Sequence, residues 1–363
     1  MAYTTIDDPS AHFHTRLYSG NNSGSGLAVT NNANSGNFQP DWVWIKRRDS
    51  ASDSGLHDSS RGSTKRLKSN EPDAEDTNSN ILASFDSNGF TIGDNSAHYN
   101  ASGTYVAWQW KANGGTTTTN DASATSIGTH DSVHQANTTA GFSIVTWTGN
   151  AEQETLAHGL GAIPEMIWIK NRADSEGWWV GATPAGNMSD GKYLLLNTND
   201  GTATNSTSFV NQNPTSTVFR VGGSNSTADN AVNGNSDNMV AYLFRSIKGY
   251  SKIGSYKGNG SSNGTFVYTG FKPAFLLFKL ASASGEHWRI FDNKRSTFNQ
   301  VGAHLFASVT SSESSETGGD FLSNGFKWRN SDDHQNGSGK TYIYMAFAEH
   351  PFVSSKGVPV TAR

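Results

Sequence analysis

One short pattern occurs three times along the chain, and it restricts the possible folds more than any other feature of the sequence. In each copy a proline precedes a run of large apolar residues, and a lysine closes the run six positions after the proline. The copies are residues 40–46, 164–170 and 273–279. Because the apolar residues are consecutive, each run predicts a short strand that is buried on both faces.

A second apolar run follows each copy roughly 70 residues later, a separation that suits one domain per copy. In each of these closing runs an alanine lies between large apolar neighbours, at Ala107, Ala241 and Ala346. A small residue at a repeated core position predicts that a backbone or an aromatic ring packs closely against it. We therefore expect three related domains in tandem.

The composition indicates the fold class. Gly, Ser, Thr and Asn are abundant, charged residues make up 16% of the chain and aromatic residues 11%. No window shows a sustained helical period. Uncharged polar turns combined with many aromatic residues favour β-structure with long loops over disorder. We predict an all-β protein with three tandem antiparallel β-sandwich domains of the jelly-roll or lectin-like type, related by an internal repeat.

Six segments are expected along the chain. They are an N-terminal attachment arm (1–11), a first β-sandwich (12–112), a Thr/Asn/Ser-rich linker (113–140), a second β-sandwich (141–248), a third β-sandwich (249–352) and a C-terminal tail (353–363). Because almost no linker separates the second β-sandwich from the third, we expect the first to be the more independent one.

Charge and apolar content exclude several partners. The net charge of −4 leaves no basic footprint for nucleic acid. No apolar run is long enough for membrane insertion. The chain has no cysteine, and its N-terminus lacks the basic and apolar regions of a signal peptide, so we expect assembly in a reducing cytoplasm.

An Asp-x-x-Arg pair follows the buried strand in the first and third copies. The pairs are Asp58 with Arg61, and Asp292 with Arg295. Such a pair either binds a ligand or forms an internal ion pair that pins its loop, an arrangement that suits the forked guanidinium group. The second copy lacks the pair, which favours the structural interpretation.

Aromatic residues after the central strands are candidates for ligand binding. Trp178 and Trp179 in the second copy stand at a place similar to that of His287 and Trp288 in the third. Tryptophan faces stack on sugar rings and supply much contact area for little entropy. The alternative is that these rings open the next strand and lie in the core.

No pattern assembles a catalytic or metal site. Glycan hydrolysis needs two carboxylates about 5 Å or about 6.5–9.5 Å apart, and the single candidates Glu154, Glu165 and Glu286 have no repeated partner. His12 with His14, and the turn at residues 332–334, lack a full ligand set. We therefore expect no catalytic residue, no metal and no cofactor, and the chain is predicted not to be an enzyme.

Four stretches of the third copy carry a family resemblance. They are residues 249–252 (GYSK), 264–271 (GTFVYTGF), 320–326 (DFLSNGF) and 342–352 (YIYMAFAEHPF). Together with the Pro-led strands, they resemble a domain common in structural proteins of marine tailed bacteriophages, and the resemblance covers nearly the whole chain. It implies a virion protein with repeated lectin-like β domains, from a tail fibre, a tail appendage or the capsid surface. It brings no catalytic residues.

The resemblance leads to expectations about function. The chain is expected to assemble in the host cytoplasm and to be exposed on the particle surface, as a tail fibre or appendage that contacts the host and its surface glycans. The expected partners are other virion proteins, bound through the N-terminal arm, and further copies of the chain in a homotrimer. The alternatives are a capsid decoration or head-fibre protein with a purely structural role, and a glycan-cleaving tailspike.

Overall fold

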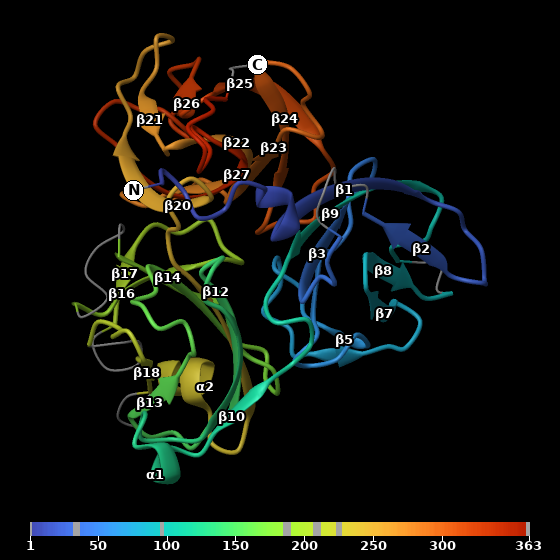
Figure 1. Cartoon of the computed structure of the whole chain (residues 1–363), viewed down its shortest axis with the longest axis vertical. Coiled ribbons are helices and arrows are strands. Elements are labelled where there is room, and N and C mark those ends of the chain that lie inside the picture. Colours follow the sequence, from blue (N-terminus) through green and yellow to red (C-terminus); the bar gives the residue numbers. More distant parts are fainter. Residues whose placement is uncertain are drawn as a thin grey trace.

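The structure is a computed structural model that describes residues 2–31, 37–94, 98–183, 190–205, 212–222 and 227–360. Strands make up 45% of the chain and helices 4%, and the sheets are antiparallel, so the predicted all-β class is confirmed. Figure 1 shows three groups of strands around a common centre, coloured from blue to cyan, from green to yellow and from orange to red. Among the described residues, no helix has the length and apolarity needed to cross a membrane.

We call residues 12–112, 141–248 and 249–352 the first, second and third repeat. The first repeat contains a four-stranded sheet in the order β1-β9-β3-β4 and a three-stranded sheet in the order β2-β8-β7, which enclose an apolar cluster. A short 3-10 helix, η1 (Pro9–Ala11), precedes it. Its strands are β1 (Phe13–Gly20), β2 (Leu27–Thr30), β3 (Trp42–Arg47), β4 (Gly55–Asp58), β5 (Lys65–Arg66), β6 (Asp76–Thr77), β7 (Leu82–Asp86), β8 (Gly89–Ile92) and β9 (Gly103–Trp110).

The second repeat is built on an eight-stranded sheet in the order β10-β11-β12-β19-β14-β15-β16-β17. The two-stranded sheet β13-β18 and the helix α2 cover one face of this sheet around a second apolar cluster. Its elements are β10 (Thr118–Asn120), α1 (Ala122–Thr125), β11 (Ser132–Asn137), β12 (Phe142–Thr148), β13 (Glu154–Ala157), β14 (Met166–Asn171), β15 (Trp179–Ala182), β16 (Lys192–Leu195), β17 (Ala203–Thr204), β18 (Val218–Val221), α2 (Thr227–Asn233) and β19 (Asn238–Phe244).

Residues 113–140, expected as a linker, instead contribute strands β10 and β11 to the sheet of the second repeat, with the short helix α1 between them. Val133 pairs with Thr146 and Asn137 with Phe142, so β11 follows β12 along most of its length. The segment has almost no apolar side chains, but β11 pairs with β10 on one side and β12 on the other, and backbone hydrogen bonds to its neighbours can hold such a strand. Composition therefore did not reveal this strand.

The third repeat has an eight-stranded sheet in the order β20-β27-β22-β23-β24-β25-β26-β21. Its strands all contribute to one interior apolar cluster, and the sheet forms a nearly closed barrel. The strands are β20 (Ser251–Lys257), β21 (Phe266–Tyr268), β22 (Phe271–Leu280), β23 (Arg289–Asp292), β24 (Val301–Phe306), β25 (Ser314–Leu322), β26 (Gly325–Trp328) and β27 (Thr341–Pro351).

The same order of four strands recurs in the three repeats. An opening strand pairs with the closing strand, the closing strand with the Pro-led strand, and the Pro-led strand with the strand that follows it: β1-β9-β3-β4, β12-β19-β14-β15 and β20-β27-β22-β23. The lysines at the ends of the Pro-led strands are equivalent, because Lys46 pairs with Val106, Lys170 with Val240 and Lys279 with Ile343.

This register corrects one expectation. Ala107 lies opposite Ile45 and Ala241 opposite Ile169, but the equivalent position in the third repeat, opposite Phe278, is Tyr344 and not Ala346. The error is two residues, and a shift of two leaves every side chain on the same face of a strand. The apolar pattern therefore could not distinguish the two alignments. The barrel interior accommodates the larger ring, which packs against Phe326 with ring centroids 5.4 Å apart.

The Pro-led strands are buried on both faces, as predicted. In β3, the residues from Trp42 to Ile45 have no exposed surface. One face of each Pro-led strand contributes to the core of its own repeat, and the other contributes to a central cluster that all three repeats share. The first repeat is therefore not independent of the others.

Aromatic pairs join every two repeats within this central cluster. The ring centroids of Trp42 and Tyr242 are 4.6 Å apart, those of Trp110 and Phe275 5.7 Å, and those of Phe244 and Phe347 6.4 Å. Burial of such rings is the largest apolar contribution that a core can receive per residue. The three repeats thus form one closed ring within a single chain (Figure 1).

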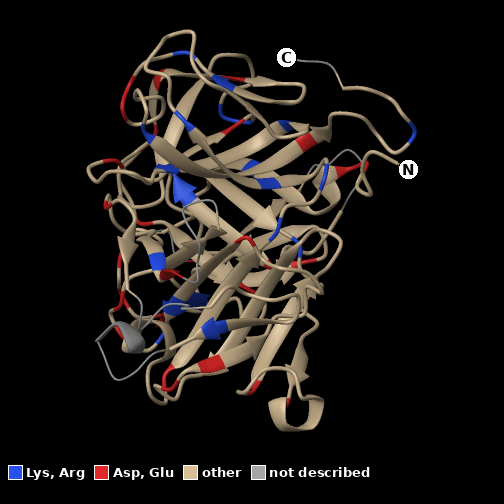
Figure 2. Cartoon of the chain, turned by 90° about the vertical axis from the view of Figure 1, so that its left-hand side faces the viewer, with Lys and Arg blue, Asp and Glu red and all other residues tan. Residues whose placement is uncertain are grey.

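The N-terminal arm lies on the third repeat of its own chain. The Tyr3 hydroxyl donates to the Gly270 carbonyl of the third repeat at 2.8 Å, and Thr4 Oγ1 donates at 2.8 Å to the carbonyl of Lys248, the last residue of the second repeat. Ile6 is buried in the central cluster. We expected the arm to bind other virion proteins, and the surface that it contacts here belongs to its own chain. The arm also meets the C-terminal segment, since Ser355 N donates to Asp7 Oδ1 at 2.6 Å, and Figure 2 shows these described parts near the two chain ends on the same side of the molecule.

Candidate functional site

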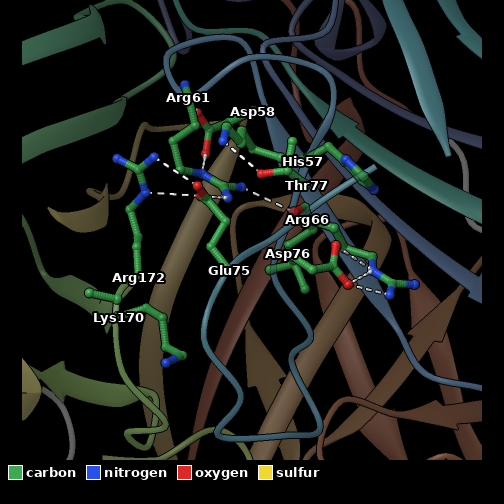
Figure 3. Close-up of polar contacts among 12 residues, drawn as sticks. His57, Asp58, Arg61, Arg66, Glu75, Asp76, Thr77, Lys170 and Arg172 are labelled. Atoms are coloured by element: carbon green, nitrogen blue, oxygen red, sulfur yellow. Dashed lines mark hydrogen bonds and ion pairs between the residues drawn. The ribbon is translucent and has the colours of Figure 1, made fainter. Parts of the chain in front are cut away.

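A buried charged cluster joins the first repeat to the second, and we call it the first junction (Figure 3). Asp58 ends β4, and its Oδ1 accepts the backbone N–H of Arg61 at 2.8 Å, which fixes the turn between them. Arg61 forms an ion pair with the Asp58 carboxylate and a second one, at 2.7 Å, with Glu75 Oε2. Arg172 of the second repeat binds both oxygens of Glu75, each at 2.9 Å, and Tyr242 Oη donates to Asp58 Oδ2 at 2.6 Å.

Burial and mutual charge set the protonation states in the first junction. The side chains of Asp58 and Arg61 have no exposed surface. Burial alone lowers the pKa of Arg61, but the charge of Asp58 and the other neighbours outweighs it, so the pKa lies above its ordinary value. Burial raises the pKa of Glu75, yet its hydrogen bonds to Arg172 and the charge of Arg61 hold it below its ordinary value. Burial lowers the pKa of the adjacent His57 to about 3, so this imidazole is neutral.

The second junction joins the third repeat to the first and repeats the same design. Arg295 Nε donates to Asp292 Oδ2 at 2.5 Å and Arg295 forms a further ion pair, at 3.3 Å, with Glu313. Arg48 of the first repeat binds both oxygens of Glu313 at 2.9 Å. Trp108 Nε1 donates to Asp292 Oδ2 at 3.0 Å, in the role that Tyr242 has in the first junction.

The third junction, between the second repeat and the third, has apolar residues at the equivalent positions. The strand register places Ala182 where the other repeats have Asp58 and Asp292. Ala281 stands two residues after the lysine, where the others have arginine. Met345 occupies the position of Trp108 and Tyr242. The aspartate, the arginine across the junction and the polar ring are therefore all replaced at once.

Backbone and tryptophan hydrogen bonds hold the third junction. Trp288 Nε1 donates to the Leu195 carbonyl at 2.8 Å. Thr202 N donates to the Ala281 carbonyl at 2.8 Å. The tryptophan contact has a counterpart in the first junction, where Trp178 Nε1 donates to the Lys68 carbonyl at 2.7 Å.

A buried lysine stands at the end of each Pro-led strand. Lys46 Nζ donates to the Val309 carbonyl of the third repeat at 2.9 Å, and Lys279 Nζ donates to the Asn199 carbonyl of the second repeat at 3.3 Å. Lys170 Nζ donates to carbonyls of its own repeat. Burial lowers the pKa of each of these three ammonium groups to about 8.

The tryptophans that we expected to bind sugar are buried, and His287 beside them is half-buried. Trp178 and Trp288 are fully buried, and their indole groups connect repeats. Trp179 is buried and stacks on Tyr193 with ring centroids 4.0 Å apart. His287 is half-buried, with Nδ1 at 2.9 Å from Ser308 Oγ. The tryptophans cannot stack on a sugar in this arrangement, because Trp178 and Trp288 belong to the central cluster and Trp179 to the core of the second repeat.

The structure forms both expected Asp-x-x-Arg ion pairs, and each pair is part of a larger cluster that includes side chains from another repeat. Each pair pins its own loop and is contacted by a ring of another repeat. A glutamate, Glu75 or Glu313, links each pair to an arginine of that repeat. The sequence did not reveal Glu75, Glu313, Arg48 and Arg172 as members of these clusters, because they are far from the pairs along the chain.

The candidate catalytic and metal-binding residues each have local partners. Glu154 accepts from Asn150 Nδ2 at 2.8 Å, Glu165 accepts from Ser246 N at 2.5 Å, and Glu286 lies 3.7 Å from Arg289. The ring of His12 packs against Tyr250, and His334 contacts Glu316. Within the described part of the chain, no group of three or more His, Asp and Glu residues could hold a metal ion.

Exposed aromatic residues are confined to one repeat. Among the described residues, the exposed aromatic side chains are Phe266, Tyr268 and Phe298, and all three belong to the third repeat. Sequence reasoning missed them. The signal was present in the alternation of Phe266, Val267 and Tyr268, but its meaning depends on a register that only the structure supplies.

Comparison with models of protein families gives a match over most of the chain. Residues 8–351 match a family described as Domain of unknown function (DUF7483). The chain belongs to this family. The DUF7483 match spans the three repeats and all three junctions, so the family unit corresponds to the complete ring and not to one repeat. No curated protein matches the chain.

Proposed function

We propose that this DUF7483 chain is a structural protein of the outer surface of a bacteriophage particle, and that it contacts the host through its third repeat. In this proposal the repeats are three lectin-like antiparallel β-sandwiches derived from one ancestral domain. The recurring strand order β1-β9-β3-β4, β12-β19-β14-β15 and β20-β27-β22-β23 supports the common origin.

The single observation that carries the proposal is the difference between the interior and the exterior of the ring. The central cluster, the ion-pair junctions and the buried tryptophans join the repeats into one body. Exposed aromatic side chains, by contrast, occur among the described residues only on the third repeat. A rigid body that presents its exposed rings on one part suits a protein that withstands the exterior of a particle and binds there.

The position of the N-terminal arm changes the expected attachment. We expected the arm to bind other virion proteins. The arm contacts the third repeat, so these two parts lie on the same side of the molecule. We therefore assign host contact to the third repeat and do not assign particle attachment to the arm. A homotrimer on the particle would multiply the weak contacts of one chain.

Immunogold labelling of purified particles tests this proposal. Antibodies raised against the recombinant full chain should label intact particles at defined positions. Fragments of these antibodies should also slow adsorption of the particles to host cells. Labelling restricted to disrupted particles, or absence of the chain from purified particles, would contradict the proposal. Surface labelling without an effect on adsorption would favour a decoration role.

A further inference from the structure

Strand β21 presents two aromatic rings to solvent from one face. The side chains of Phe266 and Tyr268 are 44% and 54% exposed, whereas Val267 between them is buried in the barrel interior. Because side chains two residues apart share a face of a strand, about 7 Å apart, the two rings lie side by side. The core of the repeat therefore depends on Val267 and not on the two rings.

The other repeats show that the fold does not require aromatic residues at these positions. The core pair Val267 and Phe326 corresponds to Val29 with Phe90 in the first repeat and to Leu156 with Phe219 in the second. By the same register, the first repeat has Ala28 and Thr30 in place of Phe266 and Tyr268, and the second has Thr155 and Ala157. Small residues thus complete the same strand in both sister repeats, so packing gives no reason for the two rings.

The two rings are held in place. Tyr268 Oη lies 3.1 Å from Tyr3 Oη, and the Tyr3 hydroxyl donates to the Gly270 carbonyl at 2.8 Å. Gly325 lies opposite Tyr268, and a Cβ on this glycine would come within 3.2 Å of Phe266 Cε2, so the phenyl ring lies against the glycine. A binding surface that is already ordered loses little side-chain entropy when a ligand arrives.

The polar rim suits a hydroxylated ligand. Lys327 pairs with Phe266 across the strands, so its side chain is on the same face as the two rings. The hydroxyl groups of Tyr3 and Tyr268 stand at the other end of the strand. Flat apolar rings flanked by hydrogen-bonding groups match the two faces and the edge of a sugar ring.

The size of the exposed patch distinguishes a sugar from a protein partner. Two half-exposed rings offer roughly 200 Å² of surface, whereas a stable protein interface buries about 800 Å² on each partner. We propose that Phe266 and Tyr268 form a platform on which a sugar ring of a bacterial surface polysaccharide stacks, with Lys327 bonding to its hydroxyl or acidic groups. This inference rests on the proposed function and names the binding site for it.

An array printed with O-chain and capsular polysaccharides of marine Gram-negative bacteria tests the platform. The full chain should bind at least one of them. The double variant Phe266→Ala, Tyr268→Thr carries the residues of the first repeat, so it should fold normally. It should bind about tenfold or more weakly, because two stacked rings are lost.

A matched control removes an exposed ring outside the platform. Phe298→Ala deletes the most exposed aromatic side chain of the same repeat, which is 80% exposed, and it should bind like the unchanged chain. The platform is excluded if the full chain binds no polysaccharide, if the double variant binds as well as the unchanged chain, or if Phe298→Ala weakens binding equally. Surface labelling of particles is independent of these outcomes, so failure of the platform can be told from failure of the proposed function.

Discussion

The first and second junctions contain a buried ionic cluster, whereas the third has apolar residues at the same positions and is held by backbone and tryptophan hydrogen bonds. The first two each bury an aspartate, an arginine and a polar ring, and each has its own central glutamate, Glu75 or Glu313. The third has Ala182, Ala281 and Met345 at the corresponding positions. The same ring geometry is therefore compatible with two chemistries, provided that all partners of a junction change together.

The physical reason is the cost of an unpaired buried charge. A buried ion pair gains little over well-packed apolar residues, because removing both ions from water costs nearly as much as their attraction returns. Loss of one partner, however, leaves a charge without compensation and costs several kcal/mol. A junction that contains either all members of the ionic cluster or none of them avoids an unpaired buried charge. The comparison leads to four predictions, from the largest expected effect to the smallest.

Asp58→Ala should be the most damaging of these changes, since it leaves Arg61 and Tyr242 without their common partner. The free energy of unfolding should fall by about 3–5 kcal/mol. Denaturant unfolding of the full chain should report this as one cooperative transition, because the repeats share the central cluster. Asp49→Ala is the control: its ion pair with Arg47 is partly exposed, and its loss should cost less than about 1 kcal/mol. Equal effects of the two changes would show that the first junction is not a tightly coupled cluster.

The three buried lysines occur in ionic and apolar junctions alike, so their effect on stability should be the same in all. Their pKa of about 8 in the folded chain lies below the ordinary value of 10.5. Between these values the unfolded chain binds more protons than the folded chain, so stability should rise with pH. The rise is at most about 1.4 kcal/mol per pH unit for each lysine.

Unfolding measured between pH 8 and pH 9 checks this slope, because at higher pH the tyrosines of the unfolded chain lose protons that the buried tyrosines of the folded chain, with their raised pKa values, retain. Lys46→Met, Lys170→Met and Lys279→Met should each reduce it by about one third. A stability that is flat or falls with pH in this window would contradict the lowered pKa values. A slope that responds to only one of the three variants would show that the repeats are not equivalent at this position.

The tryptophan hydrogen bond is common to the ionic first junction and the apolar third junction. Trp178→Phe and Trp288→Phe keep a ring in the core and remove only the N–H donor, which leaves a buried carbonyl unsatisfied. Each should cost about 1–3 kcal/mol, and the two values should agree closely. Calorimetric melting of both variants would test this agreement. A much larger cost at Trp288 would indicate that the apolar junction depends more strongly on this contact.

The smallest effect concerns the outer arginines of the two ionic junctions. A double-mutant cycle with Glu75→Gln and Arg172→Ala should give a coupling energy of about 1–2 kcal/mol, and the cycle with Glu313→Gln and Arg48→Ala less than about 1 kcal/mol. The difference follows from exposure, because the Arg48–Glu313 pair is more accessible to water than the Arg172–Glu75 pair. The reverse order would mean that burial does not control these ion pairs.

Local patterns in the sequence determined the secondary structure and much of the burial. Consecutive apolar residues in 40–46, 164–170 and 273–279 predicted strands buried on both faces. The Asp-x-x-Arg spacing of Asp58 and Arg61 predicted an ion pair that pins its loop. These inferences succeeded because they depend on side-chain periodicity and on partners within a few residues. They did not say what would bury the second face of each strand.

Only the tertiary structure decided that the repeats share one core and that two junctions are ionic. Arg172 meets Glu75 across 97 residues, and Arg48 meets Glu313 across 265. No local pattern encodes such a pairing, because it depends on how complete sheets pack. Strand β11 and the two-residue register of β27 are further features that only the tertiary structure decided. The first rests on backbone hydrogen bonds, which carry no side-chain signal, and the second on a shift that leaves every side chain on its own face.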